Sequence, residues 1–151
     1  MAILVALSAV GADIKIPALT GTPALDSAPG YFAALVWGSP EGPVIAGLGH
    51  LVTALTAGFP LTPPVHLLIA VGMAGCAWAV AALNRWRGIP WAVPAGILLN
   101  GVVFPALFIP WPGYGLAFFS SMVGPLLVAS ALNLVLAALL VRGLAGVSAG
   151  R

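Results

Sequence analysis

The sequence predicts an all-α integral membrane protein: a single transmembrane domain, residues 1–151, with six transmembrane helices. Three observations support this. Of the residues, 62% are hydrophobic, only 5% are charged, and clusters of proline and glycine divide the chain into six apolar runs. A soluble domain carries roughly 25% charged residues, so the expected surroundings are a lipid bilayer. Without a basic cluster, no nucleic-acid partner is expected.

The six apolar runs differ in length. A spanning helix takes about 20 residues, so the second run is too short to cross a bilayer unless the flanking turn residues contribute. The segments between runs, such as "GSPEGP" and "PWPGYG", have the composition of turns. The runs cover residues 2–18, 30–38, 43–58, 64–84, 89–109 and 115–141.

The positions of the arginines predict the orientation. Arg85 and Arg87 lie between the fourth and fifth runs, and Arg142 and Arg151 follow the sixth. Because cytoplasmic loops are enriched in lysine and arginine, these segments are expected to lie inside the cell. With six spans, both termini are then cytoplasmic, and the chain is expected to be a multi-pass protein of the plasma membrane.

Polar side chains are rare within and beside the runs. Each is costly in hydrocarbon and therefore needs a partner or a ligand. Lys15 is the only lysine. It either forms a structural ion pair with Asp13 or Asp26, or it brackets the mouth of an outward-facing cavity together with Asp26 and contacts a solute.

Both histidines lie in "GHLVTALTAGFPLTPPVH", residues 49–66. With the predicted orientation, His50 lies near the middle of the membrane and His66 just below the outer surface, so both can point into one outward cavity. His66 follows two prolines in the first turn of its helix and is interpreted as a site residue. For His50 and Asn100, helix packing and ligand contact are both open. Asn133, near the cytoplasmic end, is interpreted as structural.

Catalytic motifs are absent. The sequence has no Walker-type loop, no HExxH, no GxSxG and no cysteine pair. The chain is therefore not expected to hydrolyse ATP or to be an enzyme, and no cofactor or metal is expected. The competing class is a small metal-binding or catalytic membrane protein that uses His50, His66 and Asp26, although their spacing matches no metal motif.

The first run carries alanines at one helical spacing. Ala2, Ala6 and Ala9 share a face, and small residues allow two helices to approach closely in lipid. This face either packs inside the chain or docks a second membrane protein.

Three stretches resemble a known family. "MAILVALSAVGADIKIP" and "ALDSAPGYFAALVWGSPEGPVIAGLGHLVTAL" resemble the start of the S components of energy-coupling factor transporters, which are six-helix proteins that capture vitamins. "GLGHLVTALTAGFPLTPPVHLLIAVGMA", residues 47–74, is similar to the branch assigned to alpha-ribazole, a cobalamin precursor. The similarity is diffuse over most of the chain and sharper in the histidine segment.

The resemblance implies a mechanism and partners. An S component binds its solute from outside with the first outer loop and the outer ends of later helices. It then docks on a membrane coupling subunit driven by two ATPase subunits, and topples to release the solute. Carried over to this chain, Ala2 and Ala6 fall on the docking face and Asp26 falls in the substrate loop.

Alpha-ribazole is a flat aromatic base on a ribose. Phe59, Trp111 and Tyr114 lie at outer ends of runs and could stack on the base. The residues available for hydrogen bonds to the ring nitrogen and the sugar hydroxyls are His50, His66, Asn100, Lys15 and Asp26. Another uncharged aromatic vitamin would suit the same residues.

Overall fold

The computed structural model describes residues 1–18 and 23–149, and the side chains of residues 1–18 and 23–145. Arg151, one of the residues used to predict the orientation, lies outside this range. The described residues form helices and no strand, which confirms the all-α class. The helical segments are α1 (Ala2–Gly11), α2 (Ala28–Val36), α3 (Glu41–Thr56), α4 (Pro63–Arg87), α5 (Ile89–Leu98), η1 (Leu99–Val103), α6 (Phe104–Ala106) and α7 (Gly115–Ala149).

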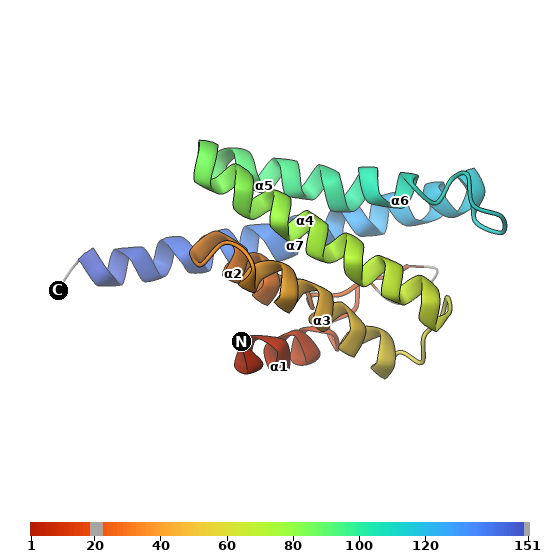
Figure 1. Cartoon of the computed structure of the whole chain (residues 1–151), viewed down its shortest axis with the longest axis horizontal. Coiled ribbons are helices and arrows are strands. Elements are labelled where there is room, and N and C mark those ends of the chain that lie inside the picture. Colours follow the sequence, from red (N-terminus) through yellow and green to blue (C-terminus); the bar gives the residue numbers. More distant parts are fainter. Residues whose placement is uncertain (19–22, 150–151) are drawn as a thin grey trace.

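The longest helices run side by side along the molecule (Figure 1). α5, the π-helical turn η1 and α6 form one continuous helix. The α2–α3 and α4–α5 turns lie at one end of the molecule, and the α3–α4 and α6–α7 loops lie at the other (Figure 1). The bundle therefore has two ends that are built from different loops.

Three helical segments of the described chain are long and apolar enough to cross a membrane: Pro63–Arg87, Ile89–Ala106 and Gly115–Ala145, with mean hydropathies of 1.9, 1.5 and 2.2. Only 39%, 28% and 28% of these spans, respectively, is buried inside the protein. Most of each apolar surface thus faces outward, which indicates a protein embedded in a membrane.

The first three helices are shorter than a full span. α1, α2 and α3 have 10, 9 and 16 residues, against about 20 for a spanning helix. α1 occupies only part of the expected run 2–18. The chain leaves the helix after Gly11, where a side chain would collide with the backbone of Leu25, and Lys15 pairs with Ala24 in an isolated β-bridge. Six spans therefore stay a prediction.

Small residues hold α2 against α3. A Cβ on Gly30 would lie 2.7 Å from Ala46, and a Cβ on Gly42 would lie 2.5 Å from Ala34. The two helices thus meet through a glycine and an alanine four residues apart on each. Small residues spaced in this way allow backbones to approach closely in lipid, where packing replaces the hydrophobic effect as the main attraction.

Capping residues set the ends of α4. The Thr62 hydroxyl accepts a hydrogen bond from the Val65 N–H at 3.4 Å, and prolines occupy the first two helical positions, where no intrahelical N–H bond is lost. At the other end Gly88 adopts a φ of +84°, a region that glycine enters without steric cost. This start places His66 in the first turn of the helix.

The close contact between α2 and α3 predicts a sharp response to one methyl group. Gly42→Ala should destabilise the protein by about 1–3 kcal/mol, because the added Cβ meets the backbone of Ala34 and the helices must separate. Gly75→Ala is the matched control on α4, where a Cβ meets nothing within 4 Å. Thermal unfolding in detergent should show a lower midpoint for Gly42→Ala only. Equal midpoints for the two variants would contradict this packing.

Candidate functional site

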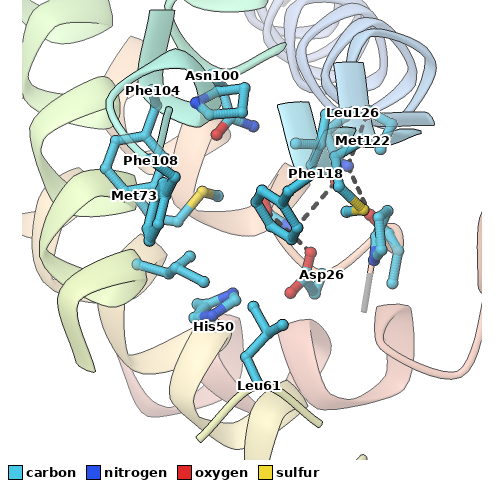
Figure 2. A pocket seen from close by; sticks show the side chains of 17 residues that line it. Asp26, His50, Leu61, Met73, Asn100, Phe104, Phe108, Phe118, Met122 and Leu126 are labelled. Atoms are coloured by element: carbon cyan, nitrogen blue, oxygen red, sulfur yellow. Dashed lines mark hydrogen bonds between the residues drawn. The ribbon is translucent and has the colours of Figure 1, made fainter. Parts of the chain in front are cut away.

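A cavity lies among α3, α4, the η1–α6 turns, α7 and the segment that precedes α2. Its volume is about 70 Å³. Figure 2 shows Asp26, His50 and Asn100 on three sides of it. The polar residues of its wall are Asp26, Ser27, His50, Asn100 and Asn133, and the larger apolar ones include Met73, Phe104, Phe108, Phe118, Met122 and Leu126. The cavity is thus mostly apolar, with a few polar groups converging on it.

Asn133 fixes the segment that brings Asp26 to the cavity. Its amide oxygen accepts hydrogen bonds from the N–H groups of Ser27 at 3.1 Å and Ala28 at 2.7 Å. Its amide nitrogen donates to the carbonyls of Ala24 and Ala129, both at 2.8 Å. One side chain of α7 therefore caps the N-terminus of α2 and satisfies the non-helical backbone before it.

The Asp26 carboxylate is held by two hydroxyl groups. Thr53 donates to one oxygen at 2.8 Å and Ser27 donates to the other at 2.9 Å. Each carboxylate oxygen keeps acceptor capacity for a further donor.

Asn100 lies in a π-helical turn. Its amide nitrogen donates to the Ser130 hydroxyl of α7 at 2.9 Å. The wide turn η1 precedes Pro105, which has no N–H to continue the regular helical bonding. Single π-turns inside α-helices occur often at functional sites. Here the turn presents Asn100 to the cavity.

The two histidines contact each other. The Nε2 atom of His50 lies 3.2 Å from the Nδ1 atom of His66, and the rings stack with centroids 5.4 Å apart. The backbone N–H of Leu61 donates to the Nε2 atom of His66 at 3.4 Å. Phe59 packs edge-on against His66 with centroids 5.8 Å apart, and adopts a φ of +50°, unusual for a residue with a side chain.

The structure brings three of the expected ligand residues to the cavity wall: Asp26, His50 and Asn100. His66 is 0% exposed and lies behind His50. Phe59 packs against His66 and does not line the cavity. Of the three residues expected at the site in this segment, His50 therefore lines the cavity, and the other two lie behind it.

Trp111, Tyr114 and Lys15 lie outside the cavity wall. The first two pack on the buried ring of Phe108, with centroids 5.7 and 5.4 Å away, and Phe108 itself faces the cavity. Lys15 is exposed. Trp111 and Tyr114 thus reach the cavity wall only through Phe108, a residue that the sequence analysis did not identify.

Sequence reasoning also missed a stripe on α7. Phe118, Met122, Leu126 and Asn133 line the cavity at intervals of four and seven residues, a spacing that places them on one helix face. This periodicity was the available signal. Asn133 was expected to be structural and near the cytoplasmic end. It is structural, but it lies in the middle of the 35-residue helix α7 and beside the cavity.

The alanine face of α1 is mostly left open by the described part of the chain. Ala2 and Ala6 are exposed and Ala9 is half-buried. α1 instead packs on α3 through Ser8, which is fully buried, at a position where a Cβ on Gly49 would approach the Ser8 hydroxyl to 2.7 Å.

Among the described residues, no three histidine, cysteine, aspartate or glutamate side chains are grouped so that they could hold a metal ion. No protein-family profile, characterised protein or solved structure matches the chain.

The Asn133 bonds predict a large effect from a small truncation. Asn133→Ala should lower the unfolding midpoint strongly, because each buried backbone group left unpaired costs about 1–3 kcal/mol. Asn84→Ala is the matched control, since Asn84 makes one partly buried bond to the Leu35 carbonyl at the other end of α2. Thermal unfolding in detergent measures both variants. Equal losses would show that Asn133 does not have the special role assigned to it.

Proposed function

We propose that the chain is the substrate-binding membrane subunit of an energy-coupling factor transporter, and that it captures a small aromatic vitamin or precursor, with alpha-ribazole favoured. The observation that carries the proposal is the mostly apolar cavity on which Asp26, His50 and Asn100 converge from three parts of the chain. Ligand sites have this composition: apolar walls for affinity and a few polar groups for orientation.

The chemistry of the wall suits a neutral aromatic riboside. Phe104, Phe108 and Phe118 offer apolar ring surface to a flat base. The carboxylate of Asp26 can accept hydrogen bonds from sugar hydroxyls. No lysine or arginine occurs among the described residues of the wall, so a phosphate ester would lack a cationic partner.

The cavity must enlarge to hold such a ligand. Its volume of about 70 Å³ is well below the roughly 300–1,000 Å³ of small-molecule sites. The polar side is held by hydrogen bonds, whereas Phe108 and Phe118 are held by ring contacts with Tyr114 and with each other. The proposal requires that Phe108, Tyr114 and Phe118, which lie between the end of α6 and the first turn of α7, move outward.

The proposal includes six spans with both termini in the cytoplasm of a cell whose plasma membrane holds the protein. Arg85, Arg87 and Arg142 support this orientation. Placing the three short helices in a bilayer is supported by the burial of most of residues 24–28, in the non-helical segment between α1 and α2. Irregular backbone is tolerated at membrane depth only in such places.

The partners in this proposal are a membrane coupling subunit and two ATPase subunits. Transport against a gradient needs an energy source, and the sequence contains no nucleotide-binding loop. The exposed Ala2 and Ala6 offer a smooth helix face on which another membrane helix could pack closely.

Ligand titration of the purified chain tests the function. We expect alpha-ribazole to bind stoichiometrically, unchanged, and more tightly than thiamine, riboflavin or biotin. Asp26→Asn should weaken binding at least about tenfold through lost hydroxyl contacts, whereas Asp13→Asn makes the same change at an exposed position and should have no effect.

Three results of that experiment would contradict the proposal at different levels. Tighter binding of another vitamin would exclude the alpha-ribazole assignment and keep the transporter class. Turnover of a ligand by the chain alone would favour a membrane enzyme. One tightly bound transition metal per chain, which His50, His66 and Asp26 would have to hold, would favour a metal-binding protein.

Substitutions on the alanine face of α1 should impair uptake and leave ligand binding intact. Ala2→Trp combined with Ala6→Trp should abolish uptake by cells that contain the coupling subunits and leave ligand affinity unchanged, because the bulky rings keep the partner helix at a distance. Leu7→Trp is the control: Leu7 is 49% exposed but lies on another side of α1. Loss of binding in the alanine variant would instead make this face part of the internal packing.

A further inference from the structure

We propose that His66 is a positioning residue that fixes the tautomer of His50, so that His50 presents an Nδ1–H donor to the cavity and selects ligands with an unprotonated aromatic nitrogen or another acceptor in that place. This inference rests on the proposed function for its ligand. The tautomer itself follows from three groups in a row: the Leu61 N–H, His66 and His50.

The Leu61 end sets the direction of this row of hydrogen bonds. The backbone N–H of Leu61 can only donate, and it points at the Nε2 atom of His66 at 3.4 Å. That nitrogen must therefore carry a lone pair. A neutral imidazole has one donor and one acceptor nitrogen, so the proton of His66 is on its Nδ1 atom.

The same rule then fixes His50. The Nδ1–H of His66 donates across 3.2 Å to the Nε2 atom of His50, which accepts with its lone pair. The proton of His50 is therefore on Nδ1. The opposite arrangement would place the Nε2–H of His66 against the Leu61 N–H, two donors facing each other. Both rings are neutral in this chain of bonds.

His50 is the member of the pair that reaches the ligand space. It lines the cavity beside Asp26 (Figure 2), whereas His66 is 0% exposed. The only sealed side-chain nitrogen or oxygen without a partner in the described residues is the Tyr31 hydroxyl. The Nδ1 atom of His50 has no protein partner in that part of the chain and is therefore not sealed. Since His50 lines the cavity, we infer that Nδ1 is the atom it offers to a ligand.

Few other donors compete for this role. Both amide hydrogens of Asn133 are bound to backbone carbonyls, the Ser27 hydroxyl donates to Asp26, and Asn100 gives one amide hydrogen to Ser130. The Asp26 carboxylate supplies acceptors. The wall therefore matches a ligand whose hydroxyls donate to Asp26 and whose ring nitrogen accepts from His50, as the imine nitrogen of a benzimidazole riboside would.

Nitrogen-15 NMR of the histidine rings in the ligand-free protein tests the tautomer directly. With only two histidines, His66→Asn identifies the His50 signals. We expect Nδ1 to be protonated and Nε2 unprotonated in both rings of the unsubstituted protein. Protonated Nε2 in His50 would overturn the proposal. This measurement needs neither ligand nor partner, so it stands even if the proposed function fails.

Binding tests the consequence for selectivity. The probes are alpha-ribazole and its indole analogue, in which C–H replaces the accepting ring nitrogen, and we expect the analogue to bind at least about tenfold more weakly. His66→Asn keeps an N–H near the position of Nδ1 and should preserve this ratio, whereas His66→Leu, with similar volume and no donor, should reduce it toward one. An unchanged ratio in His66→Leu would overturn the positioning role. Failure of both probes to bind the unsubstituted protein would overturn the proposed function and the ligand assignment alone.

Discussion

The hydrogen bonds of one amide side chain support the whole arrangement of the site. α2 begins inside the bundle, at residue 28, so the backbone before it runs through the buried interior of the protein. Buried backbone groups that are left unpaired cost about 1–3 kcal/mol each. Asn133 satisfies two N–H groups and one carbonyl there. Without these bonds, the segment that carries Asp26 would be buried with unpaired backbone groups.

The α3 helix completes the polar side of the cavity because it can approach α2 so closely. Gly30 and Ala34 of α2 meet Ala46 and Gly42 of α3, and this contact sets the rotation and height of α3. Further along the same helix, Thr53 is then in reach of Asp26 and His50 faces the cavity. Small residues in one part of the interface thus determine hydrogen-bond geometry in another.

Composition and turn residues were sufficient to predict the helical class and the start of α4, whose expected run 64–84 begins within one residue of Pro63 but ends three residues before Arg87. They did not predict the end of α1 at Gly11. The apolar run continues past that point, and the reason for the bend is a close approach to the backbone of Leu25, which is remote in sequence. Local patterns carry no information on such contacts.

The candidate site could be predicted in part for the same reason. Asp26, His50 and Asn100 stand out because polar residues are rare in an apolar sequence. Phe108 and Phe118 do not stand out, since aromatic residues in apolar runs are usually packing or lipid-facing residues. Asn133 has the expected structural role, but its place beside the cavity was missed, because the run 115–141 ends eight residues before α7 does and Asn133 lies in the middle of that helix.

The two sides of the cavity differ in how firmly they are held, and this difference connects recognition with entry. Hydrogen bonds from the Ser27 and Thr53 hydroxyls fix Asp26, and His50 is bonded to a buried neighbour. The opposite side consists of Phe108 and Phe118. Phe108 follows η1 and α6, and Phe118 lies in the first turn of α7. The segment between them contains Gly113 and Gly115, at φ of +86° and +68°. Ring contacts are weaker and less directional than buried hydrogen bonds. Under the proposed function, a ligand would displace the aromatic side while the polar side kept the geometry that identifies it, so selective binding would be compatible with a cavity that is smaller than the ligand at rest.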